Sequence, residues 1–173
     1  MKGKKALYLI DILLLAVLVA LDRYTKYLAV MRLKDKPAYI IINGVLEFNY
    51  LENKGAAFGM MQNQKYFFVF IAIIFLAVML YVLIKCPDDK KYLKLHLLLT
   101  FIGAGAIGNL IDRLRFDYVV DFIFFSLINF PIFNVADIYV TVSTAVLINL
   151  ILFVYKDHDF YFLSFKEQKY REL

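Results

Sequence analysis

The chain has 173 residues, of which 62% are hydrophobic and only 20% are charged, and its mean hydropathy is +0.68. Ordinary soluble domains are far less apolar, so this composition predicts a protein whose solvent is the lipid bilayer. The net charge of +5 suits anionic lipid headgroups, whereas the scatter of Lys and Arg over short segments argues against nucleic-acid binding. Cys86 is the only cysteine, which excludes an intrachain disulfide and a cysteine-based zinc cluster.

The first predicted membrane span covers about residues 6–28. Its apolar run from Ala6 to Leu21 is interrupted by Asp11, and aromatic and aliphatic residues after Asp22 can lengthen it. A basic start before an apolar run is also typical of signal peptides, but small residues arranged for cleavage are missing and further spans follow. Because about 20 apolar residues cross a hydrocarbon core about 30 Å thick, we expect a retained membrane helix here.

The segment after the first span has the pattern of a small β-structure. Residues 40–42 are all isoleucine, and the turn pair Asn43-Gly44 follows them. After this turn, apolar Leu46, Phe48 and Tyr50 alternate with polar residues, as in a strand with one buried face. We therefore predict β-structure at about residues 38–59, one face of which can rest on lipid.

Three further spans are predicted, at about residues 66–85, 95–113 and 137–155. The third span of the chain carries His96 and Asn109 near its two ends, and its glycine and alanine residues between 103 and 108 permit close helix contact. The segment 122–136 is also uncharged, but it is short and is interrupted by Pro131. We expect that segment to lie at the membrane interface rather than to span.

Four spans place both termini on one side of the membrane and the connecting segments 22–65 and 112–137 together on the other side. Lys and Arg slightly favour the side of the termini, which predicts that both termini are cytoplasmic. Residues 1–156 then form one membrane domain. Residues 157–173 mix aromatic and basic side chains, which favours an amphipathic cytoplasmic tail on an anionic membrane surface.

Polar side chains gather where the spans reach the side opposite to the termini. An ionised group at the centre of a bilayer costs at least roughly 2.5 kcal/mol, so such residues point to function. Asp22 and Lys26 are spaced i, i+4 and can pair on one face of the first span, although an ion pair that extends to the interface would explain them as well. Asn109, Asp112 and Arg113 project together from the third span. A solvated helix end accounts for the last two of these but not for Asn109, which lies one turn deeper.

Two acidic residues on the same side are candidates for chemistry. Asp121 lies among apolar neighbours, and desolvation there should raise the pKa of its carboxyl group. Asp137 opens the fourth span, where a carboxylate favours the helix dipole and can cap the helix, and taken alone it is better explained as a cap. Taken together, two acids in apolar surroundings at one membrane face can form a dyad that shares one proton.

Other hydrolytic machinery is missing from the sequence. There is no H-E-x-x-H zinc motif and no G-x-S-x-G elbow. Only His96 and His158 could act as a histidine base, and both fall near the side of the termini. If the protein is a hydrolase, its carboxylates must carry the reaction.

Five short motifs occur in order along the chain: Asp22-Arg-Tyr-Thr-Lys26, Asn53-Lys-Gly-Ala-Ala-Phe-Gly59, Gly108-Asn-Leu-Ile-Asp-Arg113, Val119-Val-Asp-Phe122 and Phe133-Asn-Val-Ala-Asp137. Together they resemble the bacterial lipoprotein signal peptidases, also called signal peptidase II. The resemblance extends from the first span to the fourth and leaves out the tail. Asp11 is not part of the family pattern, and the Phe-rich stretch after Asp121 lies in a region that we expect to vary.

This resemblance implies an all-α membrane protein of the bacterial cytoplasmic (inner) membrane, with four transmembrane helices and a small β cradle on the extracytoplasmic surface. It implies an intramembrane aspartic endopeptidase, an aspartyl protease whose active site lies near the extracytoplasmic face. The implied substrate is a diacylglyceryl-modified prolipoprotein, cut just before its lipidated cysteine to remove the signal peptide. The implied partners are this substrate, membrane lipids and inhibitors of the globomycin type; no cofactor or metal is implied.

The resemblance also implies a map of the site. The catalytic dyad falls on Asp121 and Asp137. Seven further residues are expected to orient the dyad and hold the substrate backbone: Asn53, Gly55, Asn109, Asp112, Arg113, Asn134 and Ala136. Asp22 and Lys26 are expected to brace the cradle as structural support.

Two other functions compete with this interpretation. A proton-coupled small-molecule transporter also uses membrane carboxylates, but it needs acids at several depths, and here they crowd one interface apart from Asp11. The chain also shows no internal repeat of the kind that many transporters carry. A non-catalytic membrane scaffold gives no reason for polar residues to converge. Cleavage of a lipidated prolipoprotein by the purified protein would separate the three functions.

Overall fold

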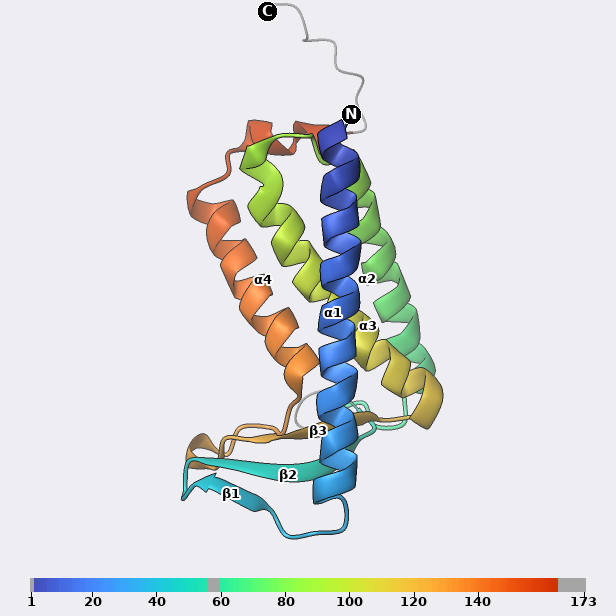
Figure 1. Cartoon of the computed structure of the whole chain (residues 1–173), viewed down its shortest axis with the longest axis vertical. Helices are drawn as coiled ribbons and strands as arrows, with labels where there is room; N and C mark the ends of the chain where they lie inside the picture. Colours follow the sequence, from blue (N-terminus) through green and yellow to red (C-terminus); the bar gives the residue numbers. More distant parts are fainter. Residues whose placement is uncertain (1, 56–59, 165–173) are drawn as a thin grey trace, which may run out of the picture.

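The computed structural model describes residues 2–55 and 60–164, so part of the second motif and the end of the tail, residues 165–173, lie outside the described chain. Within the described residues, four long helices form a bundle that stands on a small β-sheet (Figure 1). The helices are α1 (Lys2–Leu33), α2 (Lys65–Lys85), α3 (Leu93–Phe116) and α4 (Val135–Phe153). α3 is the central helix, because it packs against each of the other three.

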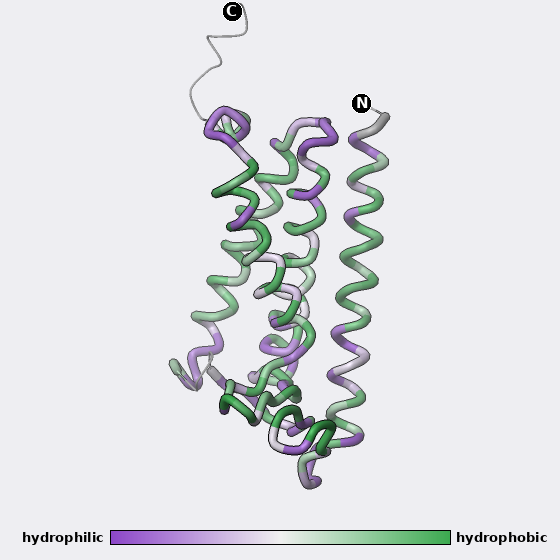
Figure 2. The backbone as a smooth tube through the Cα atoms, turned by 90° about the vertical axis from the view of Figure 1, so that its left-hand side faces the viewer, coloured by the Kyte–Doolittle hydropathy of each residue, from purple (hydrophilic) through white to green (hydrophobic). Residues whose placement is uncertain are grey.

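Three stretches of helix are long and apolar enough to cross a membrane: α2, Lys90–Phe116, which contains α3, and α4. Helices are therefore present at the three later predicted spans, with bounds that differ from the predicted ones by a few residues. The first predicted span lies in α1, which carries charges along its length, among them Asp11, Asp22 and Lys26, and has no comparably uncharged run. Hydrophobic residues dominate the middle of the bundle and hydrophilic residues gather toward its two ends (Figure 2).

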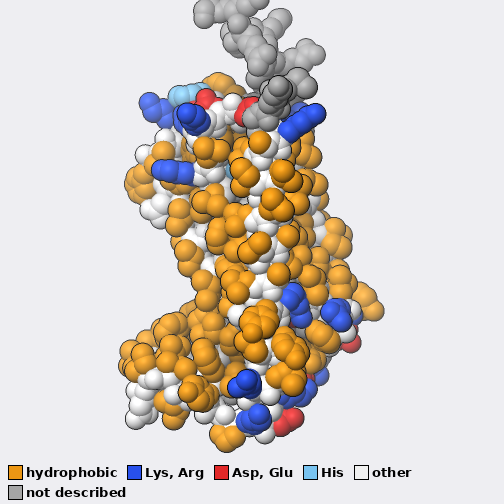
Figure 3. All heavy atoms as spheres, viewed as in Figure 1, with side chains coloured by type: hydrophobic (Ala, Val, Ile, Leu, Met, Phe, Trp, Pro, Cys, Tyr) orange, Lys and Arg blue, Asp and Glu red, His pale blue; other side chains and the backbone are white. Residues whose placement is uncertain are grey.

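The polarity of α1 is reversed relative to that of a helix in a soluble protein. Its buried stripe repeats every three or four residues and consists of Leu18, Asp22, Lys26 and Ala29. Its outward positions are apolar and exposed, for example Leu13 and Val17. The space-filling view shows the same hydrophobic covering along the bundle (Figure 3). Asp22 and Lys26 thus face the protein interior, and the pairing of Lys26 with Asp112 on α3 holds the two helices together.

α3 approaches its neighbours closely at two glycines, α4 at Gly105 and α1 at Gly108. A Cβ atom at Gly105 would meet the backbone carbonyl oxygen of Ala136, and a Cβ atom at Gly108 would meet the carboxylate of Asp22. The small residues predicted to allow close helix contact therefore do so. This contact fixes the start of α4 against the middle of α3 and of α1.

The sheet contains β1 (Tyr39–Ile42), β2 (Leu46–Asn53) and β3 (Val119–Phe124), paired antiparallel in that order. The predicted turn at Asn43-Gly44 joins β1 and β2, with Gly44 at a positive φ of 68°. β3 was not predicted, because its segment is short and its first four residues are all buried, so no alternation marks it. The pairing of β2 with β3 sets Leu51 opposite Asp121 and Asn53 opposite Val119.

The chain between β3 and α4 does not form a span, in agreement with the sequence. It contains the short 3-10 helix η3 (Ser126–Ile128) and returns to the sheet through a bridge between Ile123 and Phe133. At the opposite end of the bundle, the start of the predicted tail forms the 3-10 helix η4 (Asp157–Leu163). η4 contacts the bundle end through aromatic pairs, among them that of Phe162 with Tyr92 of η2 (Lys90–Tyr92).

Candidate active site

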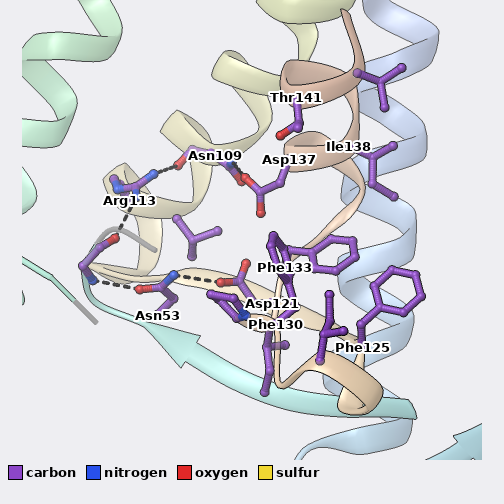
Figure 4. A pocket seen from close by; sticks show the side chains of 16 residues that line it. Asn53, Asn109, Arg113, Asp121, Phe125, Phe130, Phe133, Asp137, Ile138 and Thr141 are labelled. Atoms are coloured by element: carbon purple, nitrogen blue, oxygen red, sulfur yellow. Dashed lines mark hydrogen bonds between the residues drawn. The ribbon is translucent and has the colours of Figure 1, made fainter. Parts of the chain in front are cut away.

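A cavity of about 530 Å³ lies where α3, α4 and the sheet meet (Figure 4). One side of the cavity is polar and consists of Asn53, Gly55, Asn109, Arg113, Asp121 and Asp137. The other side is apolar and is formed mainly by the loop after β3 and the first turns of α4, including Phe125, Ile128, Phe130, Ile132, Phe133 and Val142. A substrate that fits this cavity needs a polar part and a hydrophobic part.

Asp121 reaches the cavity from β3 and is 1% exposed. Its Oδ2 accepts a hydrogen bond from Asn53 Nδ2 at 2.8 Å, and its Oδ1 accepts one from Asn134 Nδ2 at 2.6 Å. Burial raises the pKa of Asp121 to about 7, and the negative charge of Asp137 adds to the rise, while the two amide donors oppose it. The raised pKa predicted from its apolar neighbours is confirmed.

Asp137 is both a helix cap and a cavity residue. Its Oδ2 accepts from the backbone N–H of Asn134 at 3.1 Å, and its own N–H donates to Asn134 Oδ1 at 3.0 Å, which completes a capping box at the start of α4. Its Oδ1 is held separately by Asn109 Nδ2 at 2.7 Å. The cap predicted from the sequence therefore holds the carboxylate in place, and Figure 4 shows Asp121 and Asp137 turned toward the same space.

Two asparagine side chains connect the two acids. Asn109 donates to Asp137, and Asn134 donates to Asp121. Asn134 Nδ2 also lies 3.1 Å from Asn109 Oδ1, so the two amides are joined to each other. Each carboxyl group is thus oriented through both of its oxygen atoms, which is the kind of preorganisation that a reactive pair of acids requires.

Arg113 holds the loop at one edge of the cavity. Its Nη2 donates to the carbonyl oxygen of Gly55 at 3.1 Å, and its guanidinium lies 4.8 Å from the ring centre of Phe68 on α2. The backbone N–H of Gly55 in turn donates to Asn53 Oδ1 at 2.9 Å, which aims the Asn53 amide nitrogen at Asp121. The residues that follow Gly55 in this motif lie outside the described chain.

Asp112, Asn134 and Ala136, which were expected to line the site, orient the dyad and hold the substrate backbone, do not line the cavity. Asp112 is turned toward α1, where its carboxylate pairs with Arg23 and lies 2.9 Å from Lys26 Nζ. Asn134 supports the site through the hydrogen bonds described above. Ala136 is fully buried behind the cavity. The geometry therefore gives these three residues supporting positions, because their neighbours face α1 or the helix cap rather than open space.

Asp22 and Lys26 are buried, and their side chains are 3.1 Å apart. The alternative of an ion pair that extends to the interface is contradicted by this burial. Asp22 Oδ1 accepts from the backbone N–H of Ala136 at 3.1 Å, which ties α1 to the first turn of α4. Through Asp112, which also accepts from the backbone N–H of Val120 at 3.3 Å, the same cluster reaches β3.

Sequence reasoning missed the apolar side of the cavity and one residue on α4. Thr141 lines the cavity one turn beyond Asp137, and its side chain belongs to none of the motifs (Figure 4). The concentration of Phe residues between 122 and 133 is the signal that could have located the apolar side. Among the described residues, no cluster of three or more His, Cys, Asp or Glu side chains could hold a metal ion.

A bundle of membrane-crossing helices with a preorganised pair of acids in a half-apolar cavity defines an integral membrane protein with an enzyme-like site. Comparisons with known proteins agree with this class. Solved structures of bacterial membrane enzymes match the fold: one has a TM-score of 0.75 at 32% identity, covering 83% of this chain and 87% of its own. A second has a TM-score of 0.74 at 32% identity, covering 84% and 94%.

Residues 14–153 match the signal peptidase II family. The lipoprotein signal peptidase of Caldanaerobacter subterraneus is 44% identical over 143 residues, covering 82% of this chain and 95% of the relative. That of Clostridium tetani is 40% identical over 153 residues, covering 87% and 95%. The chain belongs to the signal peptidase II family. It is therefore a bacterial membrane protease, which argues against the transporter and the scaffold, and globomycin is a known inhibitor of its family.

Proposed function

We propose that this chain removes the signal peptide from diacylglyceryl-modified prolipoproteins by aspartic catalysis, cutting just before the lipidated cysteine. One observation carries the proposal: Asp121 and Asp137 face one cavity and are joined through two asparagine amides. Membership in the signal peptidase II family supports the substrate class.

The two acids divide the reaction between them. Asp137 takes a proton from water, and the resulting hydroxide attacks the scissile carbonyl carbon while Asp121 donates a proton to the carbonyl oxygen. Asp121 carries the shared proton at the start, because burial raises its pKa to about 7. When the tetrahedral intermediate collapses, the C–N bond breaks and the leaving amine takes a proton from the dyad. No covalent intermediate with the enzyme is needed.

The two sides of the cavity match the two parts of this substrate. The polar side, with the Asn53 amide and the carbonyl of Gly55 near Arg113, suits a peptide backbone. The apolar side, with Phe125, Phe130 and Val142, suits hydrocarbon. Lipid chains in the bilayer would hold the scissile bond at the depth of the acids and turn a bimolecular search into a local one.

The same proposal includes α1 as the fourth span. Its 32 residues correspond to about 48 Å of helix, more than a hydrocarbon core of about 30 Å requires. Asp22 and Lys26 face α3 rather than lipid, which lowers the cost of placing these two charged residues in the membrane. Both termini are then cytoplasmic, and the cavity opens near the extracytoplasmic face.

Cleavage by purified variants in lipid or detergent tests the dyad. Asp121→Asn and Asp137→Asn should each abolish cleavage of a lipidated prolipoprotein while the protein stays in the membrane, because an amide cannot exchange the proton. Asp117→Asn is the matched control, since Asp117 is exposed and lies outside the cavity. The precursor without its diacylglyceryl group should be cut poorly. Normal turnover by either dyad variant would overturn the aspartic mechanism.

A further inference from the structure

Lys26 lies behind the cavity with its side chain 1% exposed. Its Nζ forms ion pairs with Asp22 Oδ2 at 3.1 Å and Asp112 Oδ2 at 2.9 Å, and it donates a hydrogen bond to Asn109 Oδ1 at 2.8 Å. The two carboxylates compensate the buried charge of the ammonium. Asn109 differs from these two carboxylates, because its side chain is a neutral amide whose nitrogen donates to Asp137.

The contact with Lys26 selects one orientation of the Asn109 amide. A lysine ammonium can only donate, a primary amide donates through its nitrogen and accepts through its oxygen, and a carboxylate only accepts. With the oxygen toward Lys26, the nitrogen points to Asp137 Oδ1 at 2.7 Å. The flipped amide would set nitrogen against ammonium and oxygen against carboxylate, so both contacts would become repulsive.

The Asn134 amide is oriented in the same way, through the helix cap. Its oxygen accepts from the backbone N–H of Asp137, so its nitrogen faces Asn109 Oδ1 at 3.1 Å and Asp121 Oδ1 at 2.6 Å. Asn109 Oδ1 therefore receives donors from both Lys26 and Asn134. A flipped Asn109 would lose the contact with Asn134 as well, and both acids would be affected.

We propose that Lys26 is a positioning residue for the Asp121–Asp137 dyad, acting through the orientation of the Asn109 amide. This inference rests on the proposed function and goes beyond the bracing role expected from the sequence. Lys26 does not line the cavity, so its loss should lower kcat and leave KM nearly unchanged.

Arg23 offers a matched control on the same helix. Like Lys26, it is a cation that pairs with Asp112, but it makes no hydrogen bond to Asn109. Lys26→Met keeps the length of the side chain and removes the donor, and Arg23→Met removes the other cation. Both variants weaken the pairing of Asp112, and only the first releases Asn109.

Kinetics of the purified full-length chain with a lipidated prolipoprotein test the inference. Lys26→Met should lower kcat on the order of 100-fold, as the loss of one preorganised donor does elsewhere, with KM changed by less than about threefold. Arg23→Met should keep kcat close to that of the parent. The fraction of folded sites in each preparation is counted by titration with globomycin. Unchanged kcat in Lys26→Met, or an equal loss in Arg23→Met, would overturn the inference.

A double-mutant cycle separates positioning from general destabilisation. If Lys26 acts through Asn109, Lys26→Met should have little further effect on kcat in an Asn109→Ala background. Multiplying effects would contradict the inference. Lys26→Met could fail to fold because Asp22 is left without its cation. The double variant Lys26→Met, Asp22→Asn removes the carboxylate charge and should show the same kcat loss. Normal turnover by this double variant would count against the proposal. A parent chain that fails to cleave overturns the proposed function itself.

Discussion

Asparagine side chains oppose the effect of burial on Asp121 in the candidate site. Asn53 and Asn134 donate to the two oxygens of Asp121, and these bonds favour its charged form. Burial and the charge of Asp137 act in the opposite direction and are stronger, because the pKa of Asp121 still rises to about 7. The site thus fixes the orientation of an acid that can remain protonated near neutral pH.

The raised pKa of Asp121 predicts how stability depends on pH. The ordinary pKa is 3.8, so between about pH 4 and pH 7 the folded protein holds a proton that the unfolded chain has released. This contribution is complete below pH 4 and is lost as pH rises through 7, by at most roughly 4 kcal/mol. We expect the thermal midpoint in detergent to fall over this window in the parent, and the fall to become smaller in Asp121→Asn.

Asp117→Asn is the control for this measurement, because it removes an exposed carboxylate that lies outside the cavity. An equally steep fall in Asp121→Asn and in the parent would show that Asp121 is not the group responsible. The comparison concerns slopes, so a change in absolute stability caused by the lost charge does not affect it.

Sequence patterns predict single residues well where the cause is local. The apolar neighbours of Asp121 predicted its raised pKa, and the position of Asp137 at a helix start predicted its cap. The contact of Lys26 with Asn109 could not be predicted, because it joins residues 83 positions apart on different helices. Asp112 followed the same helical pattern as Arg113, yet it faces α1. Spacing shows which residues share a helix face but not what that face meets.

At the level of elements, the contact between α3 and α4 predicts a graded response to added methyl groups. Gly105→Ala places its Cβ against the backbone of Ala136, which cannot move without shifting α4. Gly103→Ala meets only the end of the flexible Met79 side chain, at 2.9 Å. We expect a loss of about 1–3 kcal/mol for the first variant and much less for the second, measured by unfolding in detergent. Equal effects of the two substitutions would contradict this account of the interface.

A second pair of polar residues joins α1 to α3 at the far end of the bundle. Asp11 Oδ2 lies 2.7 Å from Nδ1 of the buried His96. Replacement of either residue by leucine leaves the polar group of the other without its partner in a buried or partly buried position, which costs about 1–3 kcal/mol. The double variant should recover most of that loss, as measured by unfolding of all four proteins. Additive losses of stability would show that the pair is not coupled. All three variants should cleave at a rate close to that of the parent.

The elements themselves were predicted to different degrees for physical reasons. α2, α3 and α4 follow from the number of apolar residues that a bilayer requires, which is a strong constraint. β1 and β2 follow from a local turn and alternation. β3 has no local signature and depends on pairing with β2, a contact between distant parts of the chain. It nevertheless carries Asp121, so the element hardest to predict is the one that positions half of the proposed dyad.

At the level of the whole molecule, the candidate site is an assembly of every layer of the fold. α3 and α4 supply Asn109 and Asp137, the sheet supplies Asn53 and Asp121, and α1 supports them from behind through Lys26. Asp11 and His96 contact each other at the other end of the bundle. The reactive groups are therefore confined to one end, which suits an enzyme that works at one membrane face.

The proposed topology predicts which loops are accessible from outside an intact cell. The turn after α1 and the loop after α2 lie at opposite ends of the bundle, and Lys36 and Asp88 are exposed positions in them (Figure 1). Cys86 is fully buried, and burial raises the pKa of its thiol to about 11, so it should contribute little background labelling. A membrane-impermeant maleimide added to intact cells should label Lys36→Cys and spare Asp88→Cys, because the proposed topology has α1 and α2 each cross the membrane between the two loops. Permeabilised cells should label both variants, and Cys86→Ala measures any remaining background.

Labelling of Asp88→Cys alone in intact cells would place the cavity at the cytoplasmic face. Labelling of both variants would mean that α1 and α2 do not separate the two loops as proposed.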